Sequence, residues 1–335
     1  MRYAVIGTGW IVDSYIQGAS LAGGWELSAV CSRSREKGLA FGSKYGVSTV
    51  YTTPEELAAD SSIEAVYIAS PNRFHYAQSK TMLLAGKHVL CEKPITVLPE
   101  ECRELQALAE ERGLIYLEAI MMLHLPQRQA VLDALPTLGK ITSAHLDFSQ
   151  LSSKYAAYTR GELPNIFNPQ MATGSLMDLG IYCVYPALDW FGLPRRITAA
   201  ADFLSSGADG SCAAILEYPD KLVTLCCSKT GQSRLGSEIF GDAGTLTLES
   251  ISKLTGIRLY QNDGSFRTLA GEIDKPVLMS GEASDFLRYI TSPAETREEY
   301  AYASRLALEV SRTMAEIRRL AGIRFPGYEK GDDEP

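Results

Sequence analysis

The 335-residue sequence has no uninterrupted apolar run of the roughly 18 residues that a transmembrane helix needs. It is also short of positive charge, because 32 Lys and Arg stand against 40 Asp and Glu, a formal net charge of −8. Nucleic acid is disfavoured as a partner, since phosphate binding needs a concentrated basic surface. An anionic membrane surface is disfavoured for the same reason. We therefore expect a small-molecule partner, with no nucleic acid and no membrane.

The seven cysteines include no Cys-x-x-Cys pair, and no spacing of cysteine and histidine suits zinc, so we expect no metal site. Their odd number favours reduced thiols in a cytoplasmic protein over a disulfide framework. The first residues, MRYAVIGTG, do not resemble a secretory signal, because their apolar run ends at Gly7. The expected location is the cytoplasm.

Apolar residues make up 46% of the chain and charged residues 21%, the balance of a folded globular protein. A chain of this length is too long for one ordinary core and suits two domains. We predict two domains, one over residues 1–120 and one over 121–325. A disordered tail is expected over 326–335, which is rich in charge.

The first 120 residues alternate between strand and helix patterns, which is typical of a doubly wound parallel α/β sheet. The predicted strands are Tyr3–Ile6, Leu27–Cys31, Ala65–Ala69, His88–Cys91 and Leu114–Leu117. The predicted helices are Ile11–Leu21, Arg35–Tyr45, Pro54–Ala59, Phe74–Leu84 and Pro99–Glu111.

Beyond Met121 the pattern changes to strand-like runs separated by short turns, which favours an α+β domain with a large, mostly antiparallel open sheet. The predicted strands are Ile141–Phe148, Ile197–Phe203, Cys212–Tyr218, Leu222–Ser228, Ser237–Phe240, Thr245–Leu248 and Ile257–Tyr260. Helices are predicted over Arg128–Leu135, Leu176–Trp190, Gly281–Ile290 and Glu298–Leu320.

Gly7-Thr8-Gly9 follows a predicted strand and opens a predicted helix, the context in which a glycine pattern indicates a dinucleotide site. Gly7 permits the tight turn, and Gly9 lets the backbone approach a pyrophosphate at the positive end of the helix dipole. The third position of the pattern is Val12, where glycine or alanine is typical. The alternative is an ordinary turn between a strand and a helix.

The second predicted strand ends in Cys31-Ser32-Arg33, with no acidic residue at that point. An enzyme that uses NAD usually has Asp or Glu there, to accept a hydrogen bond from the ribose 2′-hydroxyl. A hydroxyl and a guanidinium suit the 2′-phosphate of NADP, which a carboxylate would repel. We predict NADP(H) as the favoured cofactor and NAD(H) as the alternative. Arg33 also fits an exposed charge at the start of a helix.

Two further motifs each follow a predicted parallel strand at its C-terminal end, where open α/β sheets bind ligands. They are Ser70-Pro71-Asn72-Arg73-Phe74-His75 and Cys91-Glu92-Lys93-Pro94. With Gly7–Val12 they resemble the Gfo/Idh/MocA family of NAD(P)-dependent oxidoreductases, whose Glu-Lys-Pro and Pro-Asn-x-x-His motifs are intact here. The stretch Gly174-Ser-Leu-Met-Asp178-Leu-Gly180-Ile-Tyr182 is similar to the family's helix motif in the second domain.

The resemblance implies that residues 1–120 form a Rossmann domain that binds NAD(P) and that residues 121–325 form an α/β substrate and oligomerisation domain. Because the open sheet of the second domain forms subunit contacts in this family, we expect a homodimer or homotetramer. It implies that Lys93 lies near the nicotinamide and that Asp178 and Tyr182 reach the same cleft from the second domain. The family often has histidine at the position of Tyr182, and a tyrosine there resembles the dimeric dihydrodiol and xylose dehydrogenase group. Related sequences commonly have a substrate-binding arginine where Leu123 stands.

Hydride transfer at a carbinol or carbonyl carbon also needs a group that moves the proton on oxygen and a group that stabilises charge. Asp178 and Tyr182 are spaced i, i+4, so a helix puts them on one face. A lysine cation and a phenol can act as a coupled pair, and whether Lys93 or Tyr182 donates the proton stays open. Taken alone, Tyr182 also fits a half-buried helix aromatic and Asp178 a helix cap.

The predicted catalytic residues are Lys93, Asp178 and Tyr182. The predicted cofactor-binding residues are Gly7, Thr8, Gly9, Trp10, Ile11, Ser32, Arg33, Lys37, Ser70, Pro71, Asn72, His75, Glu92 and Lys93. The predicted reaction transfers a hydride between the nicotinamide and a CH–OH carbon of a sugar, polyol or diol-like substrate. The alternatives are a reductase of an oxidised or nucleotide-linked sugar and a non-catalytic NADP-binding sensor. The presence of all three predicted catalytic residues argues against a non-catalytic sensor, because a sensor could lose any of them without loss of function.

Overall fold

The computed structural model describes residues 1–328 and divides the chain into two compact units, each of which is described by itself. The first unit comprises Met1–His124 and Asp274–Leu308, and the second comprises Leu125–Ile273 and the residues from Glu309 onward. Residues 274–308 therefore pack within the first unit, although they follow the large sheet in the sequence. The division into a cofactor domain and a substrate domain stays a prediction. Of the predicted tail, residues 329–335 lie outside the described residues.

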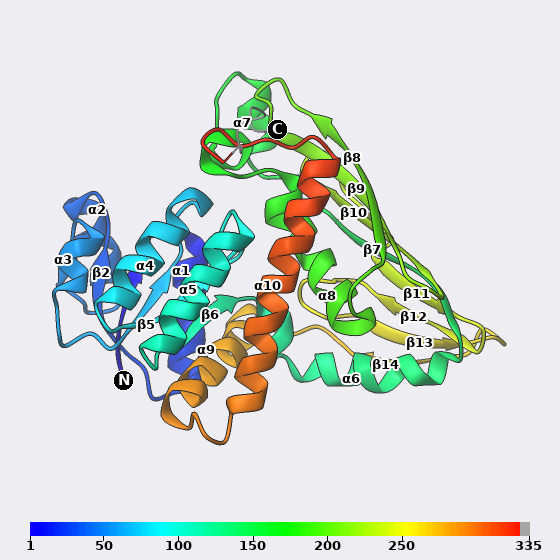
Figure 1. Ribbon diagram of the computed structural model, residues 1–335, viewed down its shortest axis with the longest axis horizontal. Helices are drawn as coiled ribbons and strands as arrows, with labels where there is room; N and C mark the ends of the chain where they lie inside the picture. Colours follow the sequence, from blue (N-terminus) through cyan, green and yellow to red (C-terminus); the bar gives the residue numbers. More distant parts are fainter. Residues whose placement is uncertain (329–335) are drawn as a thin grey trace. The chain divides into compact units, whose positions relative to one another are not determined.

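A six-stranded parallel sheet forms the centre of the first unit, with the strand order β3-β2-β1-β4-β5-β6 (Figure 1). The strands are β1 (Arg2–Ile6), β2 (Glu26–Cys31), β3 (Val50–Tyr51), β4 (Ala65–Ile68), β5 (His88–Glu92) and β6 (Tyr116–Ala119). The predicted doubly wound parallel sheet is confirmed. The two residues of β3 are too few to carry a periodic pattern, and the sequence does not predict this strand.

Helices connect these strands and cover the sheet. They are α1 (Trp10–Ala22), α2 (Arg35–Ser43), α3 (Pro54–Ala58), α4 (His75–Leu84) and α5 (Pro99–Glu111). Local sequence explains where several of them begin. The α3 helix has Pro54 in its first turn and a capping box made by Thr53 and Glu56. Pro99 occupies the first turn of α5 in the same way.

The helix α9 (Lys275–Thr291) packs along α1 and completes the core of the first unit. Gly18 in α1 permits this close approach, because a Cβ there would lie 2.6 Å from the Cβ of Met279. The sequence predicts this helix only over Gly281–Ile290. The structure begins it at Lys275, since Pro276 fits a first helical turn and Asp274 precedes it in an extended conformation.

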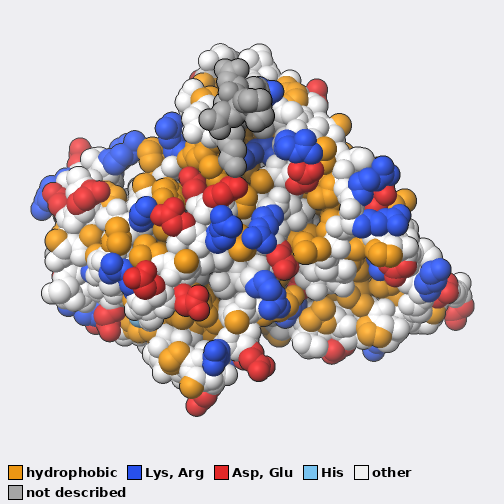
Figure 2. Space-filling model, in the orientation of Figure 1, with side chains coloured by type: hydrophobic (Ala, Val, Ile, Leu, Met, Phe, Trp, Pro, Cys, Tyr) orange, Lys and Arg blue, Asp and Glu red, His pale blue; other side chains and the backbone are white. Residues whose placement is uncertain are grey.

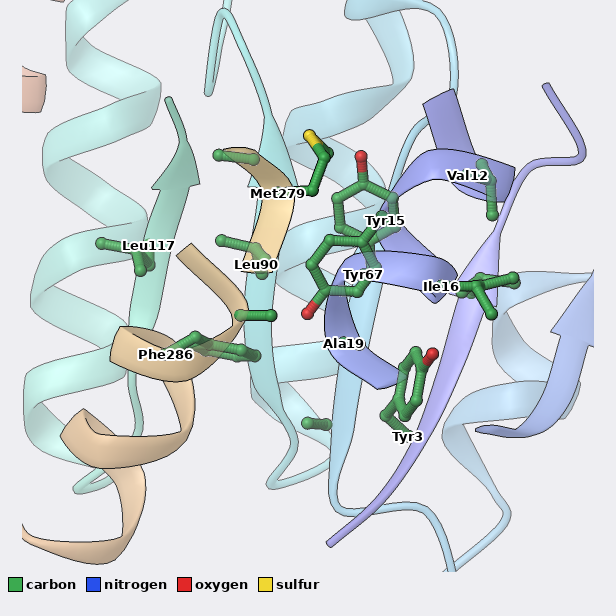
Figure 3. Close-up of a cluster of buried hydrophobic side chains, with 14 of the residues drawn as sticks. Tyr3, Val12, Tyr15, Ile16, Ala19, Tyr67, Leu90, Leu117, Met279 and Phe286 are labelled. Atoms are coloured by element: carbon green, nitrogen blue, oxygen red, sulfur yellow. The ribbon is translucent and has the colours of Figure 1, made fainter. Parts of the chain in front are cut away.

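A stack of two buried tyrosines lies at the centre of this core (Figure 3). The ring of Tyr15 on α1 lies parallel to the ring of Tyr67 on β4, with 3.9 Å between the ring centroids. Met279 and Phe286 bring side chains from α9 into the same cluster. Residues more than 200 positions apart in the sequence therefore bury one another, which explains why α9 belongs to the first unit.

The second unit is built on an eight-stranded sheet, with the strand order β14-β13-β12-β11-β7-β10-β9-β8 (Figure 1). The strands are β7 (Ile141–Ser149), β8 (Arg196–Phe203), β9 (Asp209–Glu217), β10 (Leu222–Ser228), β11 (Ser237–Gly241), β12 (Gly244–Leu248), β13 (Ile257–Gln261) and β14 (Phe266–Ala270). All neighbouring strands are antiparallel except β7 and β10, which are parallel. The predicted mostly antiparallel sheet is confirmed, with β14 as an additional edge strand.

Among residues 1–328, a helix covers one face of this sheet, and the strands β9 and β10 carry partly exposed side chains on the other face. The helix α8 (Ile181–Phe191) packs against β7 and β10, and the side chains on that face, such as Val223 and Leu225, are buried. On the opposite face Ile215 is 42% exposed and Leu222 is 50% exposed. The remaining helices are α6 (Pro126–Ala134), α7 (Tyr155–Thr159) and α10 (Arg297–Leu320), the last of which contributes residues to both units.

No helix within residues 1–328 is long and apolar enough to span a membrane. All seven cysteines are free thiols, and all but Cys226 are buried. In the same described part of the chain, no group of three or more His, Cys, Asp or Glu side chains is arranged to hold a metal ion. Acidic and basic side chains are interspersed over the face that Figure 2 shows.

Candidate active site

The loops that follow β1, β2, β4 and β5 carry the residues that the sequence predicts for the cofactor. These strands are neighbours in a parallel sheet, so all four end at the same edge. The loops contain Gly7–Gly9, Ser32–Ser34, Ser70–Asn72 and Lys93–Pro94. The structure thus brings the cofactor-binding candidates together at the edge where open α/β sheets bind ligands.

The first loop has the geometry that a bound phosphate needs. Gly7 has φ +119°, and a Cβ there would lie 2.7 Å from the carbonyl oxygen of Ala69. Gly9 is the N-cap of α1, no side chain caps this helix, and a Cβ at Gly9 would meet nothing within 4 Å. A helix start that is open and not capped by a side chain suits an anion. The side chain of Val12, at the departure from the glycine pattern, is completely buried.

Trp10, the first residue of α1, follows this loop directly, and 66% of its surface is accessible. The ammonium of Lys275 lies 3.6 Å from the centroid of the Trp10 ring. Both belong to the first unit, so α9 brings a cation to the start of α1. Direct contact of Trp10 with a cofactor stays a prediction.

The residues of the loop after β2 suit NADP(H), whose adenosine ribose carries a 2′-phosphate. The backbone N–H of Ser32 donates to the carbonyl of Tyr51 at 3.0 Å, and the hydroxyl of Ser34 accepts from the backbone N–H of Lys37 at 3.3 Å. Arg33 lies between them with an exposed side chain. The loop therefore presents a guanidinium beside the start of α2, and these residues fit a 2′-phosphate.

Three buried or half-buried side chains hold the loop that carries Lys93. The carboxylate of Glu92 accepts from the Tyr67 hydroxyl at 2.5 Å and from the backbone N–H of Lys93 at 3.3 Å. Glu118 on β6 accepts from the backbone N–H of Ile95 at 2.8 Å. His75 is 1% exposed, and its ring nitrogens lie 2.8 Å from the carbonyl oxygens of Pro94 and Ser70.

His75 therefore ties the loop after β4 to the loop after β5. Burial lowers its pKa, and the two carbonyl contacts oppose that shift. Its contacts with the backbone make it a support for Lys93, and a direct contact with the cofactor stays a prediction. The role of Glu118 is absent from the sequence prediction, although the Glu-Ala stretch that contains it is visible in the sequence.

In the second unit, Asp178 and Tyr182 stand out by their exposure. Every other residue from Ala172 to Leu188 is buried, while these two are partly exposed. Asp178 lies in a π-helical turn, Leu176–Gly180, and Tyr182 lies in the first turn of α8. The predicted continuous α-helix is thus a π-turn followed by α8, a local geometry that recurs at functional sites.

Two contacts fix these side chains within the second unit. The ring of Phe148 on β7 meets Tyr182 edge-on, with centroids 5.5 Å apart. The ammonium of Lys229, directly after β10, forms an ion pair with the Asp178 carboxylate. No sequence signal connects Lys229 with Asp178, because 51 positions separate them and only the register of β10 brings them together.

Comparison with known proteins agrees with this arrangement. Residues 1–119 match the family described as "Oxidoreductase family, NAD-binding Rossmann fold", and residues 135–247 match the "GFO/IDH/MocA C-terminal domain". The chain is 34% identical over 326 residues to scyllo-inositol 2-dehydrogenase (NADP(+)) IolU of Bacillus subtilis, which covers 97% of this chain and 98% of that protein. The chain belongs to the GFO/IDH/MocA family of oxidoreductases.

Two further relatives define how far the similarity reaches. Mouse trans-1,2-dihydrobenzene-1,2-diol dehydrogenase is 30% identical over 65% of this chain and 65% of its own length. The crystal structure of KijD10, a 3-ketoreductase of Actinomadura kijaniata in complex with TDP-benzene and NADP, superposes with a TM-score of 0.78. It covers 95% of this chain and 96% of that protein at 22% identity, and so shows the fold alone. The predicted family is confirmed.

In this GFO/IDH/MocA protein the catalytic candidates are divided between the two units. Lys93 belongs to the first unit, and Asp178 and Tyr182 belong to the second. That these three act in one site stays a prediction.

The start of the helix that carries Asp178 is fixed by Asp209 on β9, which is fully buried. One Asp209 oxygen accepts from the Ser175 hydroxyl and from the backbone N–H of Leu176, both at 2.7 Å.

The burial of Asp209 makes stability depend on pH. Burial is the largest cause that raises the pKa of Asp209 from 3.8 to about 6, against the two hydrogen bonds, which lower it. Between these values the folded chain holds a proton that the unfolded chain releases, so stability falls as pH rises. The difference of about two pKa units corresponds to roughly 3 kcal/mol.

We predict that Asp209→Asn, which cannot ionise, lacks this decline. The free energy of unfolding in urea, measured at intervals from pH 4 to pH 7.5, should fall for the wild type by up to roughly 3 kcal/mol relative to the variant. Asp202→Asn, an exposed change on β8, is the matched control and should follow the wild-type curve. A constant difference between wild type and Asp209→Asn across this range would contradict the assignment.

Proposed function

We propose that this oxidoreductase oxidises a ring hydroxyl of a cyclic polyol or sugar with NADP⁺, or reduces the corresponding ketone with NADPH. The observation that carries the proposal is the partly exposed pair Asp178 and Tyr182 in the otherwise buried stretch from Ala172 to Leu188, since a fixed carboxylate and a phenol suit a hydroxyl substrate. The relation to scyllo-inositol 2-dehydrogenase (NADP(+)) over 97% of the chain supports the substrate class.

Each side chain has a distinct part in the proposed reaction. The carboxylate of Asp178, paired with Lys229, accepts a hydrogen bond from a substrate hydroxyl and orients the carbon to be oxidised. As the C–H bond breaks, its electron pair leaves as hydride and the hydroxyl proton passes to the Tyr182 and Lys93 pair. Lys93 also stabilises the negative charge that develops on the oxygen.

The cofactor is held by the first unit in this proposal. The open start of α1 after Gly9 takes the pyrophosphate, and Ser32, Arg33 and Lys37 take the 2′-phosphate. When bound, the nicotinamide accepts or donates the hydride. Glu92, Glu118 and His75 hold the loop so that Lys93 reaches the reacting oxygen.

We further propose that the chain assembles into a homodimer or homotetramer through the uncovered face of the large sheet. Apolar side chains stand on that face at Ile215 and Leu222, which residues 1–328 leave 42% and 50% exposed. A second copy of the same face would bury them. The seven free cysteines support a reducing, cytoplasmic location for this assembly.

The cofactor assignment is tested by charge reversal at Arg33. NADP(H) should bind the wild type more tightly than NAD(H), and Arg33→Asp should weaken NADP(H) binding by about 10–100-fold, because it replaces a charge-assisted contact with repulsion. Nucleotide fluorescence titration measures both constants. Arg103→Asp, an exposed change on α5, controls for net charge and should bind as the wild type does. Tighter binding of NAD(H) by the wild type would refute the assignment.

The chemistry is tested at Lys93 and Tyr182. Sugars, cyclic polyols and vicinal diols are first screened for a change in nicotinamide absorbance. With the substrate found, Lys93→Met and Tyr182→Phe should each lower kcat by about 10²–10⁴-fold and leave NADP(H) affinity nearly unchanged. The double variant should be hardly slower than the slower single variant, since residues that act as a unit are not additive. Tyr260→Phe on β13 is the control. Near-normal turnover of Tyr182→Phe would exclude its role in proton transfer.

The assembly is tested by placing a charge on the uncovered face. The wild type should sediment at two or four times the chain mass of 36.6 kDa, and Ile215→Arg should shift it toward the single chain. Leu84→Arg, a change at an exposed apolar residue of α4, should keep the wild-type mass. If the wild type sediments as a single chain at micromolar concentration, the proposed assembly is wrong.

A further inference from the structure

Lys229 is an almost buried cation whose position is fixed from two sides. Its side chain is 7% exposed. Its backbone N–H donates to the carbonyl of Gly210 at 2.8 Å, and its own carbonyl accepts from the backbone N–H of Ser152 at 2.9 Å. The residue therefore continues the pairing of β10 with β9 and is joined to the segment after β7. Its ammonium is directed at the carboxylate of Asp178.

The partner of this cation is fixed in the same way. Asp178 donates its backbone N–H to the carbonyl of Gly174 at 3.2 Å, and the preceding turn is held by the buried Asp209. A Cβ at Gly174 would overlap the Asp209 carboxylate, so the turn cannot shift toward β9 without a collision. The side chain of Asp178 is 28% exposed, four times the exposure of Lys229. The ion pair thus has an inner, anchored cation and an outer, accessible carboxylate.

We propose that Lys229 is a positioning residue that holds the Asp178 carboxylate in one orientation, as a fixed hydrogen-bond acceptor for a hydroxyl of the substrate. This inference rests on the proposed function, because it specifies how that site selects a polyhydroxylated ring. One oxygen of the Asp178 carboxylate pairs with the ammonium, while 28% of the side-chain surface stays exposed. A substrate with several hydroxyls matches such a site, because a hydroxyl donates a hydrogen bond to a carboxylate oxygen.

A general role in stability does not account for this arrangement. An almost buried ion pair is weak as a source of stability, because removing two charges from water costs about as much as their attraction returns. The pair does supply orientation, since a charge-assisted contact restricts the carboxylate to few rotamers. The same sheet offers a comparison at the other end of β10, where Lys221 pairs with Asp220 at 2.6 Å and the aspartate is 57% exposed.

A double-variant cycle tests the proposal with the substrate found in the screen. Lys229→Met should raise KM by about 10–100-fold, the loss expected for one charge-assisted contact, and should also lower kcat. Combining it with Asp178→Asn should add little to the effect of Asp178→Asn alone, because Lys229 acts only through that carboxylate. Lys229→Arg should recover part of the KM, and Lys221→Met should keep the wild-type KM.

Thermal unfolding of the same variants gives a result that does not depend on turnover. Asp178→Asn leaves the ammonium of Lys229 buried without its counter-charge, so the double variant should have a higher Tm than Asp178→Asn alone. If the Tm of the double variant is lowered by the sum of the losses in Lys229→Met and Asp178→Asn, the pairing of the two residues is overturned. If the fold-loss in kcat/KM of the double variant equals the product of the losses in the two single variants, the positioning role is overturned. An unchanged KM in Lys229→Met would overturn it as well. If the wild type turns over no polyol or sugar, the proposed function fails, while the Tm cycle still decides whether the two residues act together.

Discussion

The parallel pairing of β1, β2, β4 and β5 is the constraint on which the site of the first unit depends. Because these strands run in one direction and lie next to each other, their following loops collect at a single edge. The chain then adds local supports. Gly7 brings the first loop against Ala69, and His75 joins the loop after β4 to the loop that contains Lys93. The order of the strands thus brings the loops to one edge of the sheet, and buried polar contacts fix the conformation of each loop.

In the second unit, the side chains of Asp178 and Tyr182 are partly exposed, while the other residues from Ala172 to Leu188 are buried. The covered face of the large sheet buries α8, and a π-turn at Leu176–Gly180 precedes it. Asp209 holds the start of that turn from β9, and Lys229 holds Asp178 from the end of β10. Two strands of the sheet therefore determine how the candidate substrate-binding carboxylate is presented.

Much of this could be predicted from the sequence, because the signals are local. The glycine pattern, the apolar strands and the Glu-Lys-Pro motif each lie within a few residues, and their order gives the parallel sheet and the family. The later sheet is readable from turn residues and alternation, although β14 follows too weak a pattern to be predicted. The start of α9 is missed by six residues even though Pro276 marks it.

The features that the sequence does not predict depend on distant contacts. The membership of α9 in the first unit follows from Gly18 and from the buried Tyr15 and Tyr67 stack, which no nearby residue indicates. The partnership of Lys229 with Asp178 and the support of the Lys93 loop by Glu118 are set by strand register. Such polar contacts are invisible to periodicity, because a single buried lysine or glutamate has no repeating pattern.

The proposed function requires that the chain moves a hydride directly between a CH–OH carbon and the nicotinamide of NADP(H). The most direct measurement incubates the protein with NADP⁺ and a polyol or sugar deuterated at its ring carbons, and determines the mass of the reduced nucleotide. We predict reduced nucleotide that carries one deuterium, in amounts equal to the ketone formed. Reduced nucleotide without deuterium would contradict direct transfer, and the absence of reduction across cyclic polyols and sugars would contradict the proposed chemistry.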